Sequence, residues 1–217
     1  MATSRSLWTQ KLLGGGKPGG NAASPRTNLV DRLPESRSRA RSAPALPGAR
    51  TPFEGFVLGV DPSLRGSGFA VVEFARGSEP RLHFSRTLRL ARELPFADCL
   101  GEIYKLCSDC CYEYPVRHVS LEETIYVNNF KVAQVLGAAR GAAIAAANVI
   151  GIPIFEYPPL RIKQAVVGFG RASKAQVAGM TKQILRLTES LPFDESDAAA
   201  AALCHAYTFR EAPPPRG

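Results

Sequence analysis

A continuous apolar run, Phe56 to Val60, lies between Gly55 and Pro62 and ends in the charged residue Asp61. An uninterrupted apolar run of this length is typical of a strand that is buried on both faces of its sheet, because a half-exposed strand alternates apolar and polar residues. We therefore expect this run to be the central strand of an α/β domain. The carboxylate then lies at the carboxyl end of the strand, where open α/β sheets usually place their ligands.

The segments that follow change from strand to helical periodicity. Strand patterns at 68–74 and 81–88 follow the first run with connections short enough for an antiparallel meander. Two strand–helix units come next. The expected later strands are 118–122 and 152–157, and the expected helices are 95–114, 130–150, 158–165, 173–187 and 195–209. This order is that of a ribonuclease-H-like fold: a single α/β domain with a mixed five-stranded sheet, strand order 3-2-1-4-5, flanked by helices.

The positive charge of the chain is concentrated in its first 52 residues. The formal net charge is +8, and residues 1–52 carry nine Lys or Arg against two acids, which is +7 and leaves +1 for the remainder. Residues 1–52 are rich in Ser, Arg, Pro and Gly and bury too little apolar surface to offset their ordering entropy. We expect disorder over 1–52 and 212–217, and one folded domain over 53–211.

Two functional interpretations of the amino-terminal extension stay open beside plain disorder. It has no acid before Asp31, as in an organelle transit peptide, and its cations could also tether DNA. No stretch is apolar enough for us to expect a transmembrane segment or a membrane partner. The five cysteines are an odd number with four on one expected helix, so we expect reduced thiols and a reducing cytosol.

Acidic residues lie at the ends of two expected strands and at the start of the last expected helix, and we expect these three positions to be close in space. Asp61 ends the first strand, and either Glu122 or Glu123 ends the parallel strand beside it; side-chain alternation alone does not choose between the two. Asp194 and Asp197 are three apart at the start of the last helix and share a face, although acids there are also common caps. Clustered carboxylates repel unless cations hold them, and oxygen ligands suit Mg²⁺ or Mn²⁺. The pattern predicts metal-assisted phosphodiester hydrolysis.

Four stretches of this sequence together resemble the RuvC family of bacterial Holliday junction resolvases. They are Val57–Phe69, Leu136–Gly141, the block from Phe155 to Gly170, and the pair Asp194-x-x-Asp197. They occur in the family's order and spacing over nearly all of residues 56–209. One departure is Ser63, which stands where the family usually has glycine.

The resemblance implies a metal-dependent endonuclease that cuts two opposed strands of a four-way DNA junction during recombination and repair. Spacing back from the Leu136–Gly141 block selects Glu122 as the second acid. The implied catalytic residues and metal ligands are Asp61, Glu122, Asp194 and Asp197. Two Mg²⁺ ions per active site are implied, with Mn²⁺ able to substitute. The implied partners are a second copy in a homodimer, with the Ala/Gly-rich helix 130–150 as the dimer region, and a RuvA/RuvB-type branch-migration helicase complex.

The same resemblance assigns DNA contacts. Lys163 and Lys174 match positions that approach DNA phosphates, and Arg140 and Arg171 are further candidates. Each is also a common type of solvated surface cation.

The chain departs from the family just after the second acid. Ile125 and then Tyr126 stand where an aromatic residue commonly wedges against unstacked bases. Ile stacks poorly on a base, so the opening of the junction and its sequence preference are less directly implied than the chemistry.

Two alternatives remain at this point: a nuclease of the same fold that acts on RNA–DNA hybrids or other branched DNA, and a catalytically silent junction-binding protein. Because the resemblance is to bacterial enzymes, we expect the bacterial cytoplasm and its nucleoid, with an organelle as the alternative if the extension is a transit peptide.

Overall fold

The computed structural model describes residues 51–123 and 129–211. A five-stranded sheet lies at its centre, in the order β4-β3-β2-β5-β6. Its strands are β2 (Gly55–Asp61), β3 (Gly66–Phe74), β4 (Arg81–Arg89), β5 (Val116–Glu122) and β6 (Ile154–Tyr157). The β2–β3 and β3–β4 pairs are antiparallel, whereas the β2–β5 and β5–β6 pairs are parallel. Numbered from β2, this is the expected order 3-2-1-4-5, and the mixed α/β sheet is confirmed.

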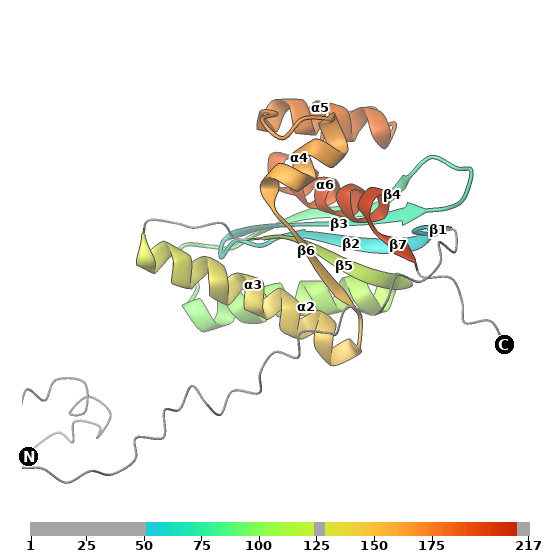
Figure 1. Cartoon of the computed structure of the whole chain (residues 1–217). Helices are drawn as coiled ribbons and strands as arrows, with labels where there is room; N and C mark the ends of the chain where they lie inside the picture. Colours follow the sequence, from blue (N-terminus) through green and yellow to red (C-terminus); the bar gives the residue numbers. More distant parts are fainter. Residues whose placement is uncertain (1–50, 124–128, 212–217) are drawn as a thin grey trace, which may run out of the picture. The chain divides into compact units, whose positions relative to one another are not determined.

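Helices cover both faces of the sheet (Figure 1). The helices α4 (Pro159–Val167), α5 (Lys174–Ile184) and α6 (Phe193–Thr208) lie on one face, and α2 (Phe96–Glu113) and α3 (Phe130–Ile150) lie on the other. Each face has its own buried apolar cluster, and alternate residues of β2 enter one or the other: Val57 packs toward α6, whereas Leu58 and Val60 pack toward α2 and α3. The double cover explains the uninterrupted apolar run of the first strand.

Two glycines allow α6 to lie directly on the sheet. A Cβ atom at Gly59 would overlap the backbone carbonyl of Ala198, and one at Gly68 would overlap the carbonyl of Asp194. The facing helix is itself lined by alanines, Ala198 to Ala202, all fully buried. Small residues on both surfaces therefore bring the backbone of α6 against β2 and β3, and this contact fixes the height of the helix's first turn above the sheet.

Most expected helix ends lie within one residue of the ends in the structure, although α4 ends at Val167 rather than 165. Local signals set some of these ends. Ser173 caps α5 in a capping box with Gln176, and Gly151 ends α3 in the left-handed conformation, with φ of 83°. The last helix begins two residues earlier than expected, at Phe193, and α5 ends at Ile184 rather than 187. The strand expected from 152 begins at Ile154.

Two short strands were not expected. β1 (Thr51–Pro52) and β7 (Arg210–Glu211) form an antiparallel pair of their own, and no periodicity announces elements of two residues. The pair joins the beginning and end of the described domain. Phe53, which follows β1, is buried at 3% exposure among the side chains of Phe74, Phe209 and two histidines.

The Ala-rich helix α3 is long and apolar enough, by length and composition alone, to cross a membrane. In the described domain it packs through Ala139, Ala143, Ala146 and Ala147 into the buried cluster that it shares with α2 and the sheet. One side of α3 therefore belongs to the core, while only 22% of its most apolar 18-residue window is buried. All five cysteines are free thiols and all are buried, as expected.

Candidate functional site

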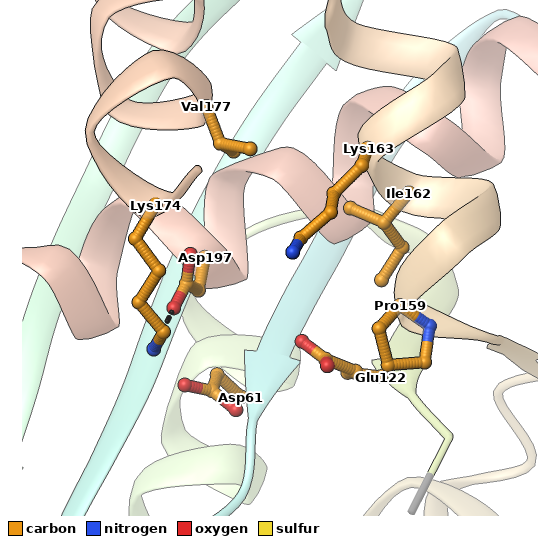
Figure 2. Close-up of a pocket in the computed structure, with 8 residues that line it drawn as sticks. All are labelled: Asp61, Glu122, Pro159, Ile162, Lys163, Lys174, Val177 and Asp197. Atoms are coloured by element: carbon orange, nitrogen blue, oxygen red, sulfur yellow. Dashed lines mark hydrogen bonds and ion pairs between the residues drawn. The ribbon is translucent and has the colours of Figure 1, made fainter. Parts of the chain in front are cut away.

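A cavity of about 210 Å³ opens at the carboxyl ends of β2 and β5. Figure 2 shows the side chains that line it. They come from both strands and from α4, α5 and α6, and are Asp61, Glu122, Pro159, Ile162, Lys163, Lys174, Val177 and Asp197. Elements that are far apart in the sequence thus bring three carboxylates and two ammonium groups to one place.

The structure chooses between the two consecutive glutamates. In β5, the side chains of His118 and Ser120 hydrogen-bond to α6, so the same face of the strand carries Glu122 toward the cavity. Glu123 lies beyond the strand and is exposed, and its backbone N–H donates to the carbonyl of Tyr157 at 2.9 Å. The residue selected by the family resemblance is therefore the one that lines the cavity.

The carboxylates in the cavity are difficult to ionise together. Burial, followed by the charges of Glu122, Asp197 and Asp194, raises the pKa of Asp61 to about 7, and the Lys174 ammonium opposes this shift. Burial also raises the pKa of Glu122, followed by repulsion from Asp197, with Lys174 and Lys163 acting in the opposite direction. The site is consequently short of positive charge.

The two lysines approach the carboxylates from different helices. Lys174, the first residue of α5, places its Nζ 2.8 Å from Oδ2 of Asp197, whose side chain is only 13% exposed. This hydrogen bond raises the pKa of Lys174. Lys163 projects from α4 toward the cavity without forming an ion pair there (Figure 2). Both predicted phosphate contacts thus lie at the mouth of the acidic site.

Asp194 is adjacent to the cavity but is not one of the residues that line it. It stands in the first turn of α6 over Gly66 and Gly68, and its charge contributes to the raised pKa of Asp61. The residue at the N-cap of this helix is Pro192, and no side chain caps the turn, so a capping role for Asp194 is not what the structure shows. Its expected role as a metal ligand stays a prediction.

The departure at Ser63 has a local explanation. Its hydroxyl oxygen accepts a hydrogen bond from the backbone N–H of Gly66 at 3.1 Å, and Ser67 bonds back to the backbone of Ser63 on both its N–H and its carbonyl. The Ser63 side chain therefore stabilises the turn that follows Asp61 with a hydrogen bond that a glycine at this position could not form.

The remaining predicted DNA contacts are placed differently. Arg140 is paired with Glu156 of β6, so its guanidinium already has an anionic partner within the chain. Arg171 is exposed between α4 and α5. Ile125 and Tyr126 lie outside the described residues.

One residue that matters for the site escaped the sequence analysis. Glu195, in the first turn of α6, accepts hydrogen bonds from the Ser85 hydroxyl at 2.5 Å and from the backbone N–H and hydroxyl of Thr87 at 3.1 and 3.2 Å. It thereby ties the turn that carries Asp194 and Asp197 to β4. The only sequence signal was its position between two acids, where it could not be told from a solvated glutamate.

The donor set fits a hard divalent cation. Among the described residues that line the cavity, carboxylate oxygens are the only metal-binding groups, which suits Mg²⁺ or Mn²⁺ and not zinc. Across residues 51–123 and 129–211, no three acidic, imidazole or thiol side chains are already gathered closely enough to hold one ion. The fit consequently rests on the chemistry of the donors and on the raised pKa values of Asp61 and Glu122, which a cation would reverse.

The chain matches known proteins over nearly the whole described domain. The family model described as crossover junction endodeoxyribonuclease RuvC matches residues 57–205. A relative of that name from Halorhodospira halophila is 43% identical over 157 residues, which cover 72% of this chain and 92% of the relative.

Solved structures give the same result. Thermus thermophilus RuvC in complex with Holliday junction substrate is 31% identical, with a TM-score of 0.67 over 70% of this chain and 93% of that one. The yeast mitochondrial Holliday junction resolvase Ydc2 has a TM-score of 0.51 over 73% of this chain and 79% of its own, and at 11% identity this similarity shows the fold alone. The ribonuclease-H-like fold is thus confirmed, and the chain belongs to the RuvC family of crossover junction endodeoxyribonucleases.

Proposed function

We propose that this protein is a Holliday junction resolvase, which hydrolyses phosphodiester bonds in two opposed strands of a four-way DNA junction. The observation that carries the proposal is the convergence of Asp61, Glu122 and Asp197 in one cavity, where the pKa of Asp61 is raised to about 7 and two lysines lie at the mouth. The names of the relatives and the bound substrate of the Thermus structure support the same substrate class.

We propose that Asp61, Glu122 and Asp197 hold divalent cations, with Asp194 as a fourth ligand. The cation is Mg²⁺, two per active site, and Mn²⁺ can substitute. When bound, it supplies a water of lowered pKa and neutralises charge on the departing oxygen. The carboxylates of this chain orient that ion, and their repulsion disappears when it binds.

Lys174 has two tasks in this proposal. In the absence of a cation its ammonium satisfies Asp197 and offsets part of the negative charge around Asp61. With DNA bound, a flexible lysine that is 66% exposed can turn from the carboxylate to the phosphate that is being cut, where negative charge develops. Lys163, which forms no ion pair in the described chain, is free to bind a neighbouring phosphate.

Cutting two opposed strands requires two active sites, and we propose that α3 joins two copies. Gly137 and Gly141 lie one helical turn apart, and the space where their Cβ atoms would be is open, so a second helix could approach the backbone closely. Phe130, which precedes Gly137 by two helical turns and lies on the same side of α3, is 73% exposed. A shared apolar face of this kind favours a homodimer.

The cellular setting is also a proposal. The relatives with the same name are bacterial, which supports action on the nucleoid in a bacterial cytoplasm together with a RuvA/RuvB-type helicase complex. An organelle becomes the location if residues 1–52 act as a transit peptide.

The experiment is the cleavage of a synthetic mobile four-way junction beside a linear duplex, an RNA–DNA hybrid and a flap of the same sequence, with Mg²⁺ or with chelator. The proposal predicts paired nicks at symmetric positions in opposed strands of the junction alone, and none in chelator. Preferential cleavage of the hybrid or the flap would show that the proposed substrate is wrong. Tight junction binding without nicks under Mg²⁺ or Mn²⁺ would show that the protein binds junctions without cutting them.

A further inference from the structure

The connection between α4 and α5 exposes an aromatic ring close to the end of α4 that lines the cavity. Phe169 is 47% exposed, and Leu160, in the first turn of α4, is 64% exposed. Gly170 lies against Leu160 so closely that a Cβ atom would overlap its side chain. Leu160 directly follows Pro159, which lines the cavity. The connection therefore folds back over α4 to the end at which the acidic site opens.

The exposure of Phe169 is not a consequence of a loose loop. On one side, Gly168 ends α4 with φ of 95°, a conformation that favours glycine. On the other, Ala172 is buried in the core at 1% exposure, and Ser173 begins the capping box of α5. The ring is therefore presented to solvent between two fixed points, and it contributes little to the packed core.

The charge of the segment that carries this ring favours a polyanion. Residues 159–174 contain four cations, Arg161, Lys163, Arg171 and Lys174, and no acid, whereas residues 53–217 as a whole carry only +1. Arg161 and Arg171 are exposed.

We propose that Phe169 is a platform on which a nucleobase released from pairing at the branch point of the junction stacks. The phosphates that flank that base lie along Arg161 and Arg171. Aromatic rings between cations are a general means of holding unpaired nucleotides, since every base has a face that can stack. This inference rests on the proposed function and identifies a residue that discriminates an open branch point from a continuous duplex.

The test compares Phe169→Ala with Phe169→Trp and with Tyr112→Ala, a control in which a 74% exposed aromatic is removed from α2 on the other face of the sheet. Binding is measured in chelator on a four-way junction with 2-aminopurine at the branch point and on a linear duplex. We expect Phe169→Ala to weaken junction binding about tenfold, to leave duplex binding unchanged and to alter the fluorescence response of the probe. Phe169→Trp should restore binding and response, and Tyr112→Ala should match the wild type.

Three results would overturn the inference: wild-type behaviour of Phe169→Ala on both DNAs, an equal loss on junction and duplex, or a changed oligomeric mass, which would make the platform an interface between copies. Thermal unfolding of each variant checks that the fold is retained. Junction cleavage by the wild type separates this inference from the proposed function. If the wild type nicks the junction and Phe169→Ala behaves identically, only the platform is refuted; if the wild type neither binds nor nicks it, the function itself fails.

Discussion

Two clusters of polar groups lie on the same face of β5, and they are stabilised in opposite ways. At the carboxyl end, Glu122 faces Asp61 and Asp197, and burial and mutual repulsion raise the pKa values of Asp61 and Glu122. Four residues earlier, His118 Nδ1 lies 2.8 Å from Nε2 of His205, in α6. The first cluster holds like charges together, and the second is a neutral hydrogen-bonded pair.

The histidine pair is completed by its surroundings. Nδ1 of His205 lies 2.9 Å from the Tyr157 hydroxyl, and the rings of Phe53, Phe155 and Phe209 pack around the imidazoles. Burial lowers the pKa of His205 to about 3, so this fully buried side chain is uncharged at neutral pH. The comparison shows that β5 and α6 are joined by a hydrogen-bonded contact at His118 and His205. This favourable contact offsets the repulsion between the carboxylates at the other end of the two elements.

The largest expected effect is on cleavage at the acidic cluster. Glu122→Gln should reduce junction cleavage on the order of 10³-fold while junction binding persists, because the amide keeps the shape but loses the charge that orients a cation. The neighbouring Glu123→Gln is the matched control, since Glu123 is exposed and, among the described residues, only its backbone forms a hydrogen bond. Rate measurements under single-turnover conditions decide this, and similar losses in both variants would contradict the site.

Next in size is the loss of the histidine contact. His205→Ala should lower the free energy of unfolding by about 3 kcal/mol, because it leaves a cavity and removes the partners of His118 and Tyr157. Urea unfolding measures this loss. Tyr157→Phe, which removes one hydroxyl, should cost about 1 kcal/mol. The cleavage rate of the folded fraction at low temperature should stay within a few-fold of the wild type; a selective loss of cleavage without destabilisation would give the pair a catalytic role.

The two clusters change the free energy of unfolding in opposite directions as the pH falls. The pKa of His205 is about 3 in the folded protein and near 6.5 when unfolded, so the unfolded chain binds more protons between these values and stability falls as pH drops below 6.5. The pKa of Asp61 is raised to about 7, so its protonation below pH 7 favours the folded state. Between pH 6.5 and 5, the effect of His205 lowers the free energy of unfolding of the wild type by about 2 kcal/mol, and His205→Gln should lack that decrease. Urea unfolding in chelator measures it. An unchanged pH slope in this variant would refute the assignment.

The smallest effect concerns the contact that positions the first turn of α6. Glu195→Ala removes three hydrogen bonds to Ser85 and Thr87 on the partly exposed β4 and should cost about 1 kcal/mol. Because Asp194 and Asp197 share this turn, the maximal cleavage rate should fall about tenfold with little change in junction affinity. Glu195→Gln, which retains an acceptor, should recover part of the rate. A loss of junction affinity alone would contradict a positioning role.

Local signals account for what could be predicted of this fold. The apolar run before Asp61 gave a strand buried on both faces, and Ser173 and Gly151 marked helix ends with their own side chain or backbone conformation. In contrast, the two-residue strands β1 and β7 depend on the approach of segments about 160 residues apart. Long-range pairing of so few residues leaves no periodicity to detect.

The site, like the fold, was predictable only in part. Asp61, Glu122 and Asp197 could be proposed because acids at adjacent strand ends and on one helix face converge in this topology, although the choice of Glu122 over Glu123 needed the family spacing. The pairing of Arg140 with Glu156 and the contacts of Glu195 could not, because a charged side chain looks the same in sequence whether it contacts solvent or a distant strand.

The account's central claim is that the acidic cluster is unfavourable for folding and is retained to hold a cation. The free energy of unfolding of the wild type and Asp61→Asn, measured at pH 7.5 in chelator and in Mg²⁺, tests it directly. We predict that the variant is more stable by about 2–4 kcal/mol in chelator, and that Mg²⁺ stabilises the wild type and narrows this difference. Equal stabilities in chelator, together with the same response of both proteins to Mg²⁺, would contradict the claim.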